Sequence, residues 1–184
     1  RGARTTVTIG DRTVIREYVT VNGGTNEGDV TSVGADALIM ACCHVAHQCV
    51  VGKGVIMANA AMLSGHVIVE DQATIGGMTG VHQFVRIGKM AMVGGCSKIN
   101  QDVPPYMMVD GNPARLIGLN AVGLERRGVS ADACKALKGA LKCIFHDHLP
   151  LREALTQVRA QWTGLPEVEH LADFIENSQR GVTR

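Results

Sequence analysis

The sequence has few aromatic residues, little net charge and no long apolar run. Phe, Trp and Tyr make up only 3% of the 184 residues, although apolar residues reach 46%, so a wide globular core filled by aromatic rings is not expected. The formal net charge is +1 with 19% charged residues, which provides no general attraction to nucleic acid or a membrane surface. No apolar run approaches the ~18 residues that a membrane-spanning helix needs, so we expect no integral membrane segment.

Cysteine pairs of the C-x-x-C type are also missing, although the chain has six cysteines. No secretory signal precedes them, and this pattern favours small buried hydrophobic residues in a reducing compartment over disulfides. We therefore expect a cytoplasmic location, with an organelle of bacterial origin as the alternative. The chain starts at Arg1, almost in mid-pattern, which suggests a piece of a longer protein, a processed form or a trimmed one.

What the sequence does contain is an aliphatic residue at every sixth position. The unbroken series is Val33, Ile39, Val45, Val51, Met57, Leu63, Val69, Ile75, Val81, Ile87, Val93 and Ile99, and Ile9, Ile15 and Val21 precede it in the same phase. A period of six fits neither a helix nor an alternating strand. It is typical of a triangular solenoid in which three six-residue sides make one turn and the aliphatic side chains point inward.

The period predicts where the solenoid begins, breaks and ends. Residues 1–106 are expected to form it, with a polar loop at 25–31 expelled from the coil, because the phase fails only at Glu27. Pro104 and Pro105 end the pattern, since proline cannot donate to a further ladder. Residues 107–129 are then expected to be an extended connection.

A helical period replaces the six-residue period from Ser130 onward, so residues 130–184 are expected to form a C-terminal helical domain. Ser130 is a candidate N-cap, and Pro166 is a candidate first residue of the last helix. The apolar stripes of the three expected helices are Leu137, Leu141, Ile144 and Phe145; Leu151, Leu155, Val158 and Trp162; and Val168, Leu171 and Ile175. The predicted fold class is therefore all-β with an α appendage.

Four histidines lie in the predicted solenoid, at His44, His47, His66 and His82, and none occupies an inward position. One such residue would be interpreted as a solvated side chain, but four within forty residues favour a functional site. A zinc site is a rival interpretation. It is disfavoured here because the four occupy four different phases of the six-residue repeat, so stacking should not bring three of them to one corner.

General-base catalysis is the preferred interpretation of these histidines. A neutral imidazole can take a proton from a hydroxyl group that attacks an activated acyl group. A backbone N–H in a glycine-rich turn such as Ser64-Gly65-His66 can stabilise the resulting oxyanion. Arg126 and Arg127 offer donors for a phosphate, or they cap carbonyls at a helix end.

Several motifs resemble one family of hexapeptide-repeat acyltransferases. They are Ile15-Arg16-Glu17, His44-Val45-Ala46-His47, Gly65-His66, Ile75-Gly76-Gly77-Met78-Thr79, Val81-His82-Gln83-Phe84, Met92-Val93-Gly94-Gly95-Cys96-Ser97, Gln101-Asp102-Val103-Pro104-Pro105-Tyr106 and Gly118-Leu119-Asn120 followed by Gly123-Leu124 and Arg126-Arg127-Gly128. Together they resemble the acyl-carrier-protein–UDP-N-acetylglucosamine O-acyltransferases, which open lipid A synthesis. The last segment separates this family from other hexapeptide transferases.

This resemblance implies more than the period can show. It implies a left-handed parallel β-helix of hexapeptide repeats, whereas the period leaves the handedness open, and a homotrimer with clefts between neighbouring solenoids. The reaction implied is transfer of a 3-hydroxyacyl chain from acyl carrier protein to the 3-hydroxyl of UDP-N-acetylglucosamine. No cofactor and no metal are implied, because phosphopantetheine arrives on the acyl carrier protein, and no nucleic acid takes part.

The resemblance also assigns roles to residues. It makes His47 the general base and the Gly65 amide the donor to the thioester oxyanion. Residues implied to bind substrate are His44, His66, His82 and Gln83 for the sugar and pyrophosphate, and Asn120 and Arg126 for the nucleotide. Gly95 and Met92 fall where the family sets acyl-chain length, and a glycine at position 95 leaves room for a longer chain.

Three departures from the family pattern keep other functions open. Gln48 follows His47 where the family has Asp, so slower chemistry is expected, because an amide orients the ring without adding charge. Asn22-Gly23-Gly24-Thr25 lacks the family's arginine. Family members also have further coils before the position of Arg1. A catalytically impaired trimeric scaffold and, less favoured, a zinc-dependent lyase of carbonic anhydrase type are the alternatives.

Overall fold

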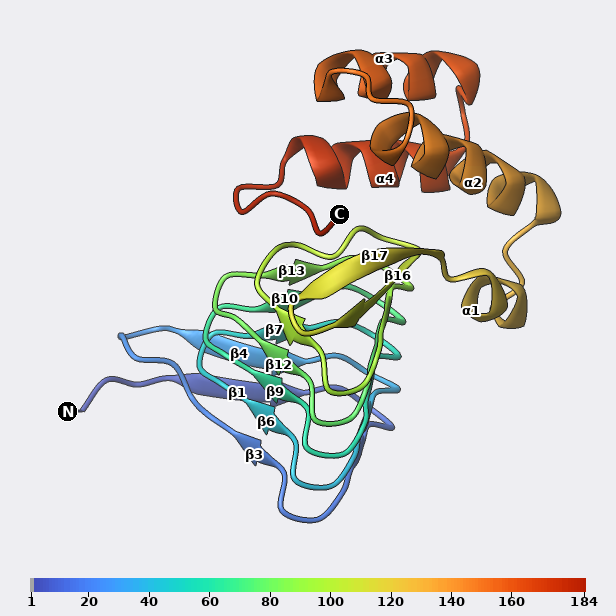
Figure 1. The fold of residues 1–184 in the computed structure, drawn as a ribbon. Helices are drawn as coiled ribbons and strands as arrows, with labels where there is room; N and C mark the ends of the chain where they lie inside the picture. The colour runs from blue at the N-terminus through green and yellow to red at the C-terminus, as the bar shows by residue number, and fades with distance from the viewer. Residues whose placement is uncertain (1) are drawn as a thin grey trace.

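The computed structural model describes residues 2–184, and these form a parallel β-solenoid followed by a C-terminal helical region (Figure 1). Short strands from successive turns stack into three sheets. One sheet, here sheet A, contains β1 (Thr6–Ile9), β4 (Val30–Val33), β7 (Val50–Val51), β10 (Ile68–Val69) and β13 (Arg86–Ile87). Sheet C contains β3 (Thr20–Val21), β6 (His44–Val45), β9 (Met62–Leu63), β12 (Gly80–Val81) and β15 (Lys98–Ile99).

Sheet B is longer, because a hairpin extends it beyond the last turn. Its strands are β2 (Val14–Ile15), β5 (Leu38–Ile39), β8 (Ile56–Met57), β11 (Thr74–Ile75), β14 (Met92–Val93), β16 (Met107–Gly111) and β17 (Ala114–Leu119). β16 pairs in parallel with β14, and β17 then pairs antiparallel with β16. The segment 107–129, expected to be an extended connection, therefore carries this hairpin and helix α1 (Ala121–Arg126), and that expectation is wrong in detail.

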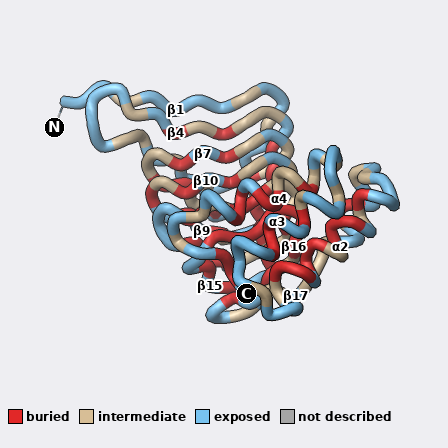
Figure 2. Tube along the Cα trace, turned by 90° about the horizontal axis from the view of Figure 1, so that it is seen from above, coloured by how far each residue is buried: buried red, intermediate tan, exposed pale blue. Residues whose placement is uncertain are grey.

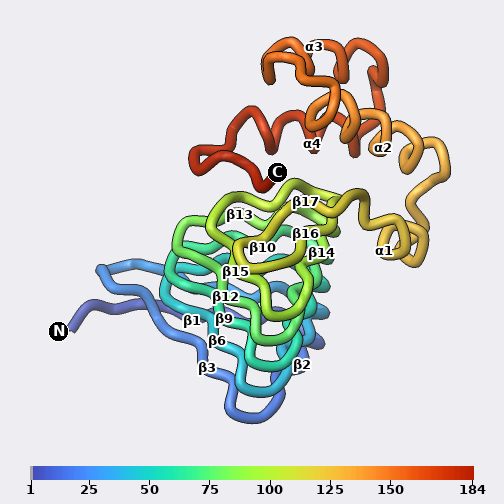
Figure 3. Tube along the Cα trace, in the orientation of Figure 1, coloured from blue at the N-terminus to red at the C-terminus, as the bar shows by residue number. Residues whose placement is uncertain are grey.

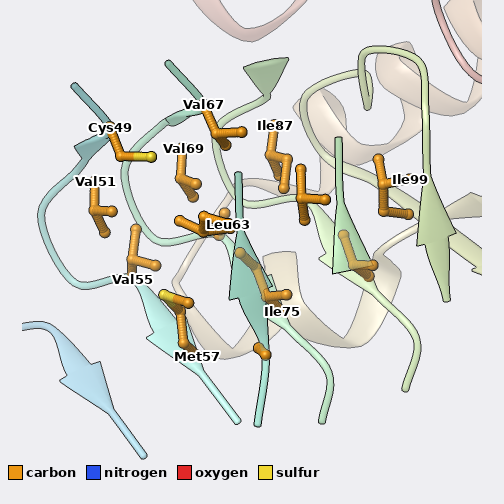
Figure 4. Packing of buried hydrophobic residues seen from close by; sticks show 14 of the residues in the cluster. Cys49, Val51, Val55, Met57, Leu63, Val67, Val69, Ile75, Ile87 and Ile99 are labelled. Carbon is orange, nitrogen blue, oxygen red and sulfur yellow. The ribbon is translucent and has the colours of Figure 1, made fainter. Parts of the chain in front are cut away.

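The six-residue period is confirmed as the core of the solenoid. Ile39, Leu63 and Ile75 have at most 1% of their surface exposed, and Figure 4 shows such side chains filling the space between the sheets. Glycine is needed where successive turns pass closest. A Cβ placed on Gly34 would lie 2.6 Å from the carbonyl carbon of Gly52 in the next turn.

The polar loop leaves the coil without changing its register. Val51 pairs with Val69, one turn of 18 residues away, whereas Ile9 pairs with Val33, 24 residues away. The extra six residues belong to the segment between β3 and β4, so the loop predicted at 25–31 is real, although β4 already begins at Val30. Ile9 is in phase but 49% exposed, because it lies in the first described turn of the stack (Figure 2).

The prediction that the cysteines are buried is correct for some of them and wrong for others. All six cysteines are free, and Cys43, Cys49 and Cys143 are buried as expected. Burial raises the pKa of the Cys49 thiol to about 11. Cys42 and Cys96 are instead exposed, because each occupies a left-handed position at an outer corner, with φ of 61° and 57°.

The C-terminal helices are α2 (Ala131–Phe145), α3 (Leu151–Gln161) and α4 (Pro166–Glu176), and they form a separate cluster over the last turns of the solenoid (Figure 3). The Ser130 Oγ accepts a hydrogen bond from the Ala133 amide, which confirms the predicted N-cap. The tail after α4 returns to the solenoid, where Val182 pairs with Asp102. None of the helices described between residues 2 and 184 is long and apolar enough to cross a membrane.

Glu70 joins helix α4 to the solenoid. Its carboxylate accepts a 2.7 Å hydrogen bond from the Nε2 of His170, and it also contacts the Arg86 guanidinium at 3.3 Å. Burial alone would raise the pKa of Glu70, but His170, the Lys89 amide and Arg86 together outweigh burial and lower it. The ionised carboxylate is therefore the form that stabilises this junction.

Glu70→Gln is expected to lower the free energy of unfolding by about 1–3 kcal/mol at neutral pH, because it removes a charged partner from a largely buried junction. A depressed carboxyl pKa stabilises the fold above the unfolded-state pKa, near 4.5, and that stabilisation is lost as the pH falls through the lower folded-state value. Urea unfolding of both proteins between pH 3 and pH 7 should show the difference shrinking in acid. A difference that stays constant across this range would contradict this account.

Candidate functional site

The corner at which sheet C passes to sheet A gathers most of the predicted site residues. His47, Gly65 and Gln83 occupy the same place in this corner in successive turns, and His66 and His82 are adjacent to them. These histidines differ in phase within the six-residue repeat and still share one corner, although among residues 2–184 no three of them are placed to hold a metal ion. The three sides of a turn differ, so the period that aligns side chains is 18 residues, and it brings three histidines to one corner.

His47 lies directly over Gly65. A Cβ placed on Gly65 would come within 2.3 Å of a ring carbon of His47, so only glycine leaves room for the imidazole. The ring also meets His66 edge-on, with 5.3 Å between the ring centres. The Gly65 amide makes no hydrogen bond within residues 2–184, so it remains available to a bound group.

Gln48 fixes the orientation of the His47 ring. The Nδ1 of His47 and the Oε1 of Gln48 are 2.6 Å apart. The Gln48 backbone has a φ of 56°, and its amide donates to the Oγ1 of the buried Thr31 at 2.8 Å. The Nε2 of His47 has no partner within the described chain and is the nitrogen left for chemistry.

Asp29 is a part of this corner that the sequence interpretation missed. Its Oδ2 accepts a 2.6 Å hydrogen bond from the Nε2 of Gln48 and also accepts from the amides of Thr25 and Asn26. The hydrogen bond from the Asn26 amide contributes most to lowering the pKa of Asp29, with desolvation opposing it. The spacing in the sequence could have indicated Asp29, because it precedes His47 by one full turn of 18 residues.

A cavity of 420 Å³ lies beside the corner and is lined by His66. His66 stacks on Phe84 with 4.7 Å between ring centres, and both line this cavity. Arg180, from the C-terminal tail, also lines it and reaches to 3.4 Å from the Nδ1 of His82. His44 lies on strand β6 of sheet C, just before the corner, and its Nδ1 is 2.7 Å from the Oγ1 of Thr20.

The remaining predicted residues lie on or beside sheet B, on the side of the solenoid opposite the histidine corner. Met92, Asn120 and Arg126 line a cavity of 510 Å³ there. Asn120 caps helix α1, since its Oδ1 accepts from the Gly123 amide, and its Nδ2 donates to the Met90 carbonyl. Gly95 lies at the corner after β14, where a Cβ would be 3.3 Å from the Gly77 carbonyl oxygen.

Two functions were predicted for Arg126 and Arg127, phosphate binding and the capping of helix carbonyls, and the two side chains differ in which one they can perform. Arg127 donates to the carbonyls of Gly123 and Gln72, so it caps and anchors helix α1. Arg126 is exposed and its guanidinium makes no hydrogen bond within residues 2–184, so this group is available to a ligand. Among the same residues no group of three or more His, Cys, Asp or Glu side chains is placed to hold a metal ion.

Comparisons with known proteins identify the family of this chain. The family model described as "Udp N-acetylglucosamine O-acyltransferase; Domain 2" matches residues 102–183. A curated acyl-[acyl-carrier-protein]–UDP-N-acetylglucosamine O-acyltransferase from Anaeromyxobacter sp. is 44% identical over 100% of this chain and 72% of its own length. The chain belongs to this family of O-acyltransferases.

Other members of the family give the same result in sequence and structure. The Gloeothece citriformis relative is 48% identical over 97% of this chain, which spans only 64% of that relative. The UDP-N-acetylglucosamine acyltransferase of Bacteroides fragilis has a TM-score of 0.97 at 38% identity, covering 100% of this chain and 72% of that one. The chain thus spans about two thirds of its family relatives.

Proposed function

We propose that this chain transfers a 3-hydroxyacyl group from acyl carrier protein to the 3-hydroxyl of UDP-N-acetylglucosamine, in lipid A synthesis. The observation that carries the proposal is the His47–Gly65 pair. An imidazole held through Nδ1, with Nε2 open, lies over a backbone N–H that has no partner within residues 2–184. This pair provides a base and an oxyanion donor at one place.

The reaction needs only proton and acyl transfer. The Nε2 of His47 takes the proton of the sugar hydroxyl as its oxygen forms a bond to the thioester carbonyl carbon, and the Gly65 N–H donates to the oxyanion. The C–S bond then breaks, and the leaving thiolate takes the proton from His47. No electron acceptor or metal is required, so the proposal includes no cofactor of the chain's own.

The division of site residues between two faces supports a homotrimer. The histidine corner and the cavity with Arg126 lie on opposite sides of one solenoid, so a single copy does not bring them together. In a three-fold assembly, the corner of one copy can face sheet B of the next. The free thiols support the further proposal of a reducing, cytoplasmic location.

Mixing two inactive variants tests this shared cleft. His47→Ala and Arg126→Ala chains should each be impaired, but refolding them together should restore part of the activity, because some clefts then pair an intact His47 with an intact Arg126. Acyl transfer to UDP-N-acetylglucosamine is the measurement, and each variant refolded alone is the control. Mixtures no more active than their components would contradict a cleft built from two copies.

Gly65→Ala is expected to lower kcat by about 100-fold with little effect on stability, because the new methyl group would displace the His47 ring. Gly77→Ala is the matched control, since it lies at a different corner and a Cβ there meets its nearest neighbour at 3.1 Å. The measurement is acyl transfer beside a thermal melt. A fully active Gly65→Ala enzyme would exclude the proposed placement of the base.

A further inference from the structure

We propose that Asp29 is a positioning residue that acts through Gln48 to keep the proton of neutral His47 on Nδ1. The proposal deepens the proposed function and rests on it, because it assigns Asp29 a role at the same base. The two contacts that carry it are Asp29 Oδ2 to Gln48 Nε2, at 2.6 Å, and Gln48 Oε1 to His47 Nδ1, also at 2.6 Å.

The direction of both hydrogen bonds follows from what each group can donate. An ionised carboxylate only accepts, so the end of the Gln48 amide that faces Asp29 is its NH₂ group. The other end, which faces His47, is then the carbonyl oxygen, and it also only accepts. The Nδ1 of His47 must therefore carry the hydrogen, and Nε2 has the free lone pair that a general base needs.

Hydrogen bonds from backbone amides hold two members of this chain of groups, Asp29 and Gln48. The Oδ2 of Asp29 accepts from the amides of Thr25 at 2.9 Å and Asn26 at 2.7 Å, which closes the loop between β3 and β4. Gln48 is held by the bond from its own amide to Thr31. The loop that leaves the coil thus delivers a carboxylate to the corner of the next turn.

The charge of Asp29 has a second effect on His47. Gln48 is neutral, so the negative charge nearest to the developing imidazolium through this chain of groups is that of Asp29. The titratable group packed on the ring from the next turn is His66, and Glu27 of the same loop accepts from the Arg4 amide at 2.7 Å. A carboxylate one amide away should favour imidazolium modestly, because distance and solvent weaken it.

The position of the proton can be measured without any enzymatic activity. ¹⁵N-detected NMR of histidine rings distinguishes the two tautomers, and the His47→Gln variant identifies the His47 signals. Wild-type His47 is expected to be the Nδ1–H form, and Asp29→Ala to show a mixture of tautomers. Asn26→Ala is the control, because it lies in the same loop and also contacts Asp29, at 3.3 Å, but not Gln48. Unchanged tautomers in Asp29→Ala would overturn the proposal.

Kinetics separate this role from simple closure of the loop. Asp29→Ala should lower kcat about tenfold with KM unchanged. Asp29→Asn, which keeps an acceptor but removes the charge, should lower kcat by less than Asp29→Ala does. In a Gln48→Leu background, Asp29→Ala should cause no further loss of kcat. Losses of kcat that add up would show that Asp29 acts through the loop alone.

The failure of the proposed function can be told apart from the failure of this inference. A wild-type chain that transfers no acyl group, yet shows the expected tautomers, would contradict the proposed function and leave the assignment of Asp29 intact.

Discussion

Ile75→Asp is expected to leave no folded protein. Ile75 has none of its surface exposed and lies in the middle of the core column, between Met57 in the turn before and Val93 in the turn after. An unpaired carboxylate there loses its hydration and opens a gap in a stack whose turns stabilise one another, so we expect a loss of about 5 kcal/mol or more. Circular dichroism and the soluble yield on expression measure the outcome.

A matched substitution controls for the change of residue type. Ile68→Asp makes the same change at an outward position of sheet A, where the side chain is 39% exposed. The new carboxylate can stay hydrated there, so this protein should fold, with a loss of about 1 kcal/mol. Equal tolerance at both positions would show that the six-residue phase does not define the core.

His47→Ala should lower kcat by about 10²–10⁴-fold, which is the usual contribution of a general base. Its stability should change little, because the ring contributes only to the corner and not to the solenoid core. Acyl transfer and a thermal melt, measured on the same preparation, give the two quantities. His66→Ala is the comparison, and it should raise KM more than it lowers kcat, since His66 lines the cavity beside the base. Retained activity in His47→Ala would remove His47 from the mechanism.

The solenoid was predictable because every turn must place an apolar side chain at the same inward position, so the pattern repeats many times along the sequence. Val45, Leu63 and Val81 stack at the same place in three turns, and each had to be apolar for its own turn to pack. The hairpin of β16 and β17 had no such repetition. Its strands pair once, with a register shift between Met108 and Val109, so no period reveals them.

The sequence predicts residues for the candidate site but does not show how the fold groups them. Spacing by six separates His47 from His66 and His82, whereas the three sides of each turn bring them to one corner. Asp29 was missed for a related reason. Its role depends on where a loop outside the repeat returns, and its 2.6 Å contact with Gln48 joins segments that the local pattern treats as unrelated.

The returning C-terminal tail has a consequence for self-association. A stack of parallel strands ends in a row of unpaired backbone groups, which can act as a template for another chain and for fibre growth. Here the antiparallel strand β17 occupies that position on sheet B, and the pairing of Val182 with Asp102 occupies it beside sheet A. Lys98, on the last strand of sheet C, places a charge at the third edge. The chain itself thus covers two of the three sheet edges at this end of the solenoid, and a charge lies on the third, so the addition of another chain is disfavoured.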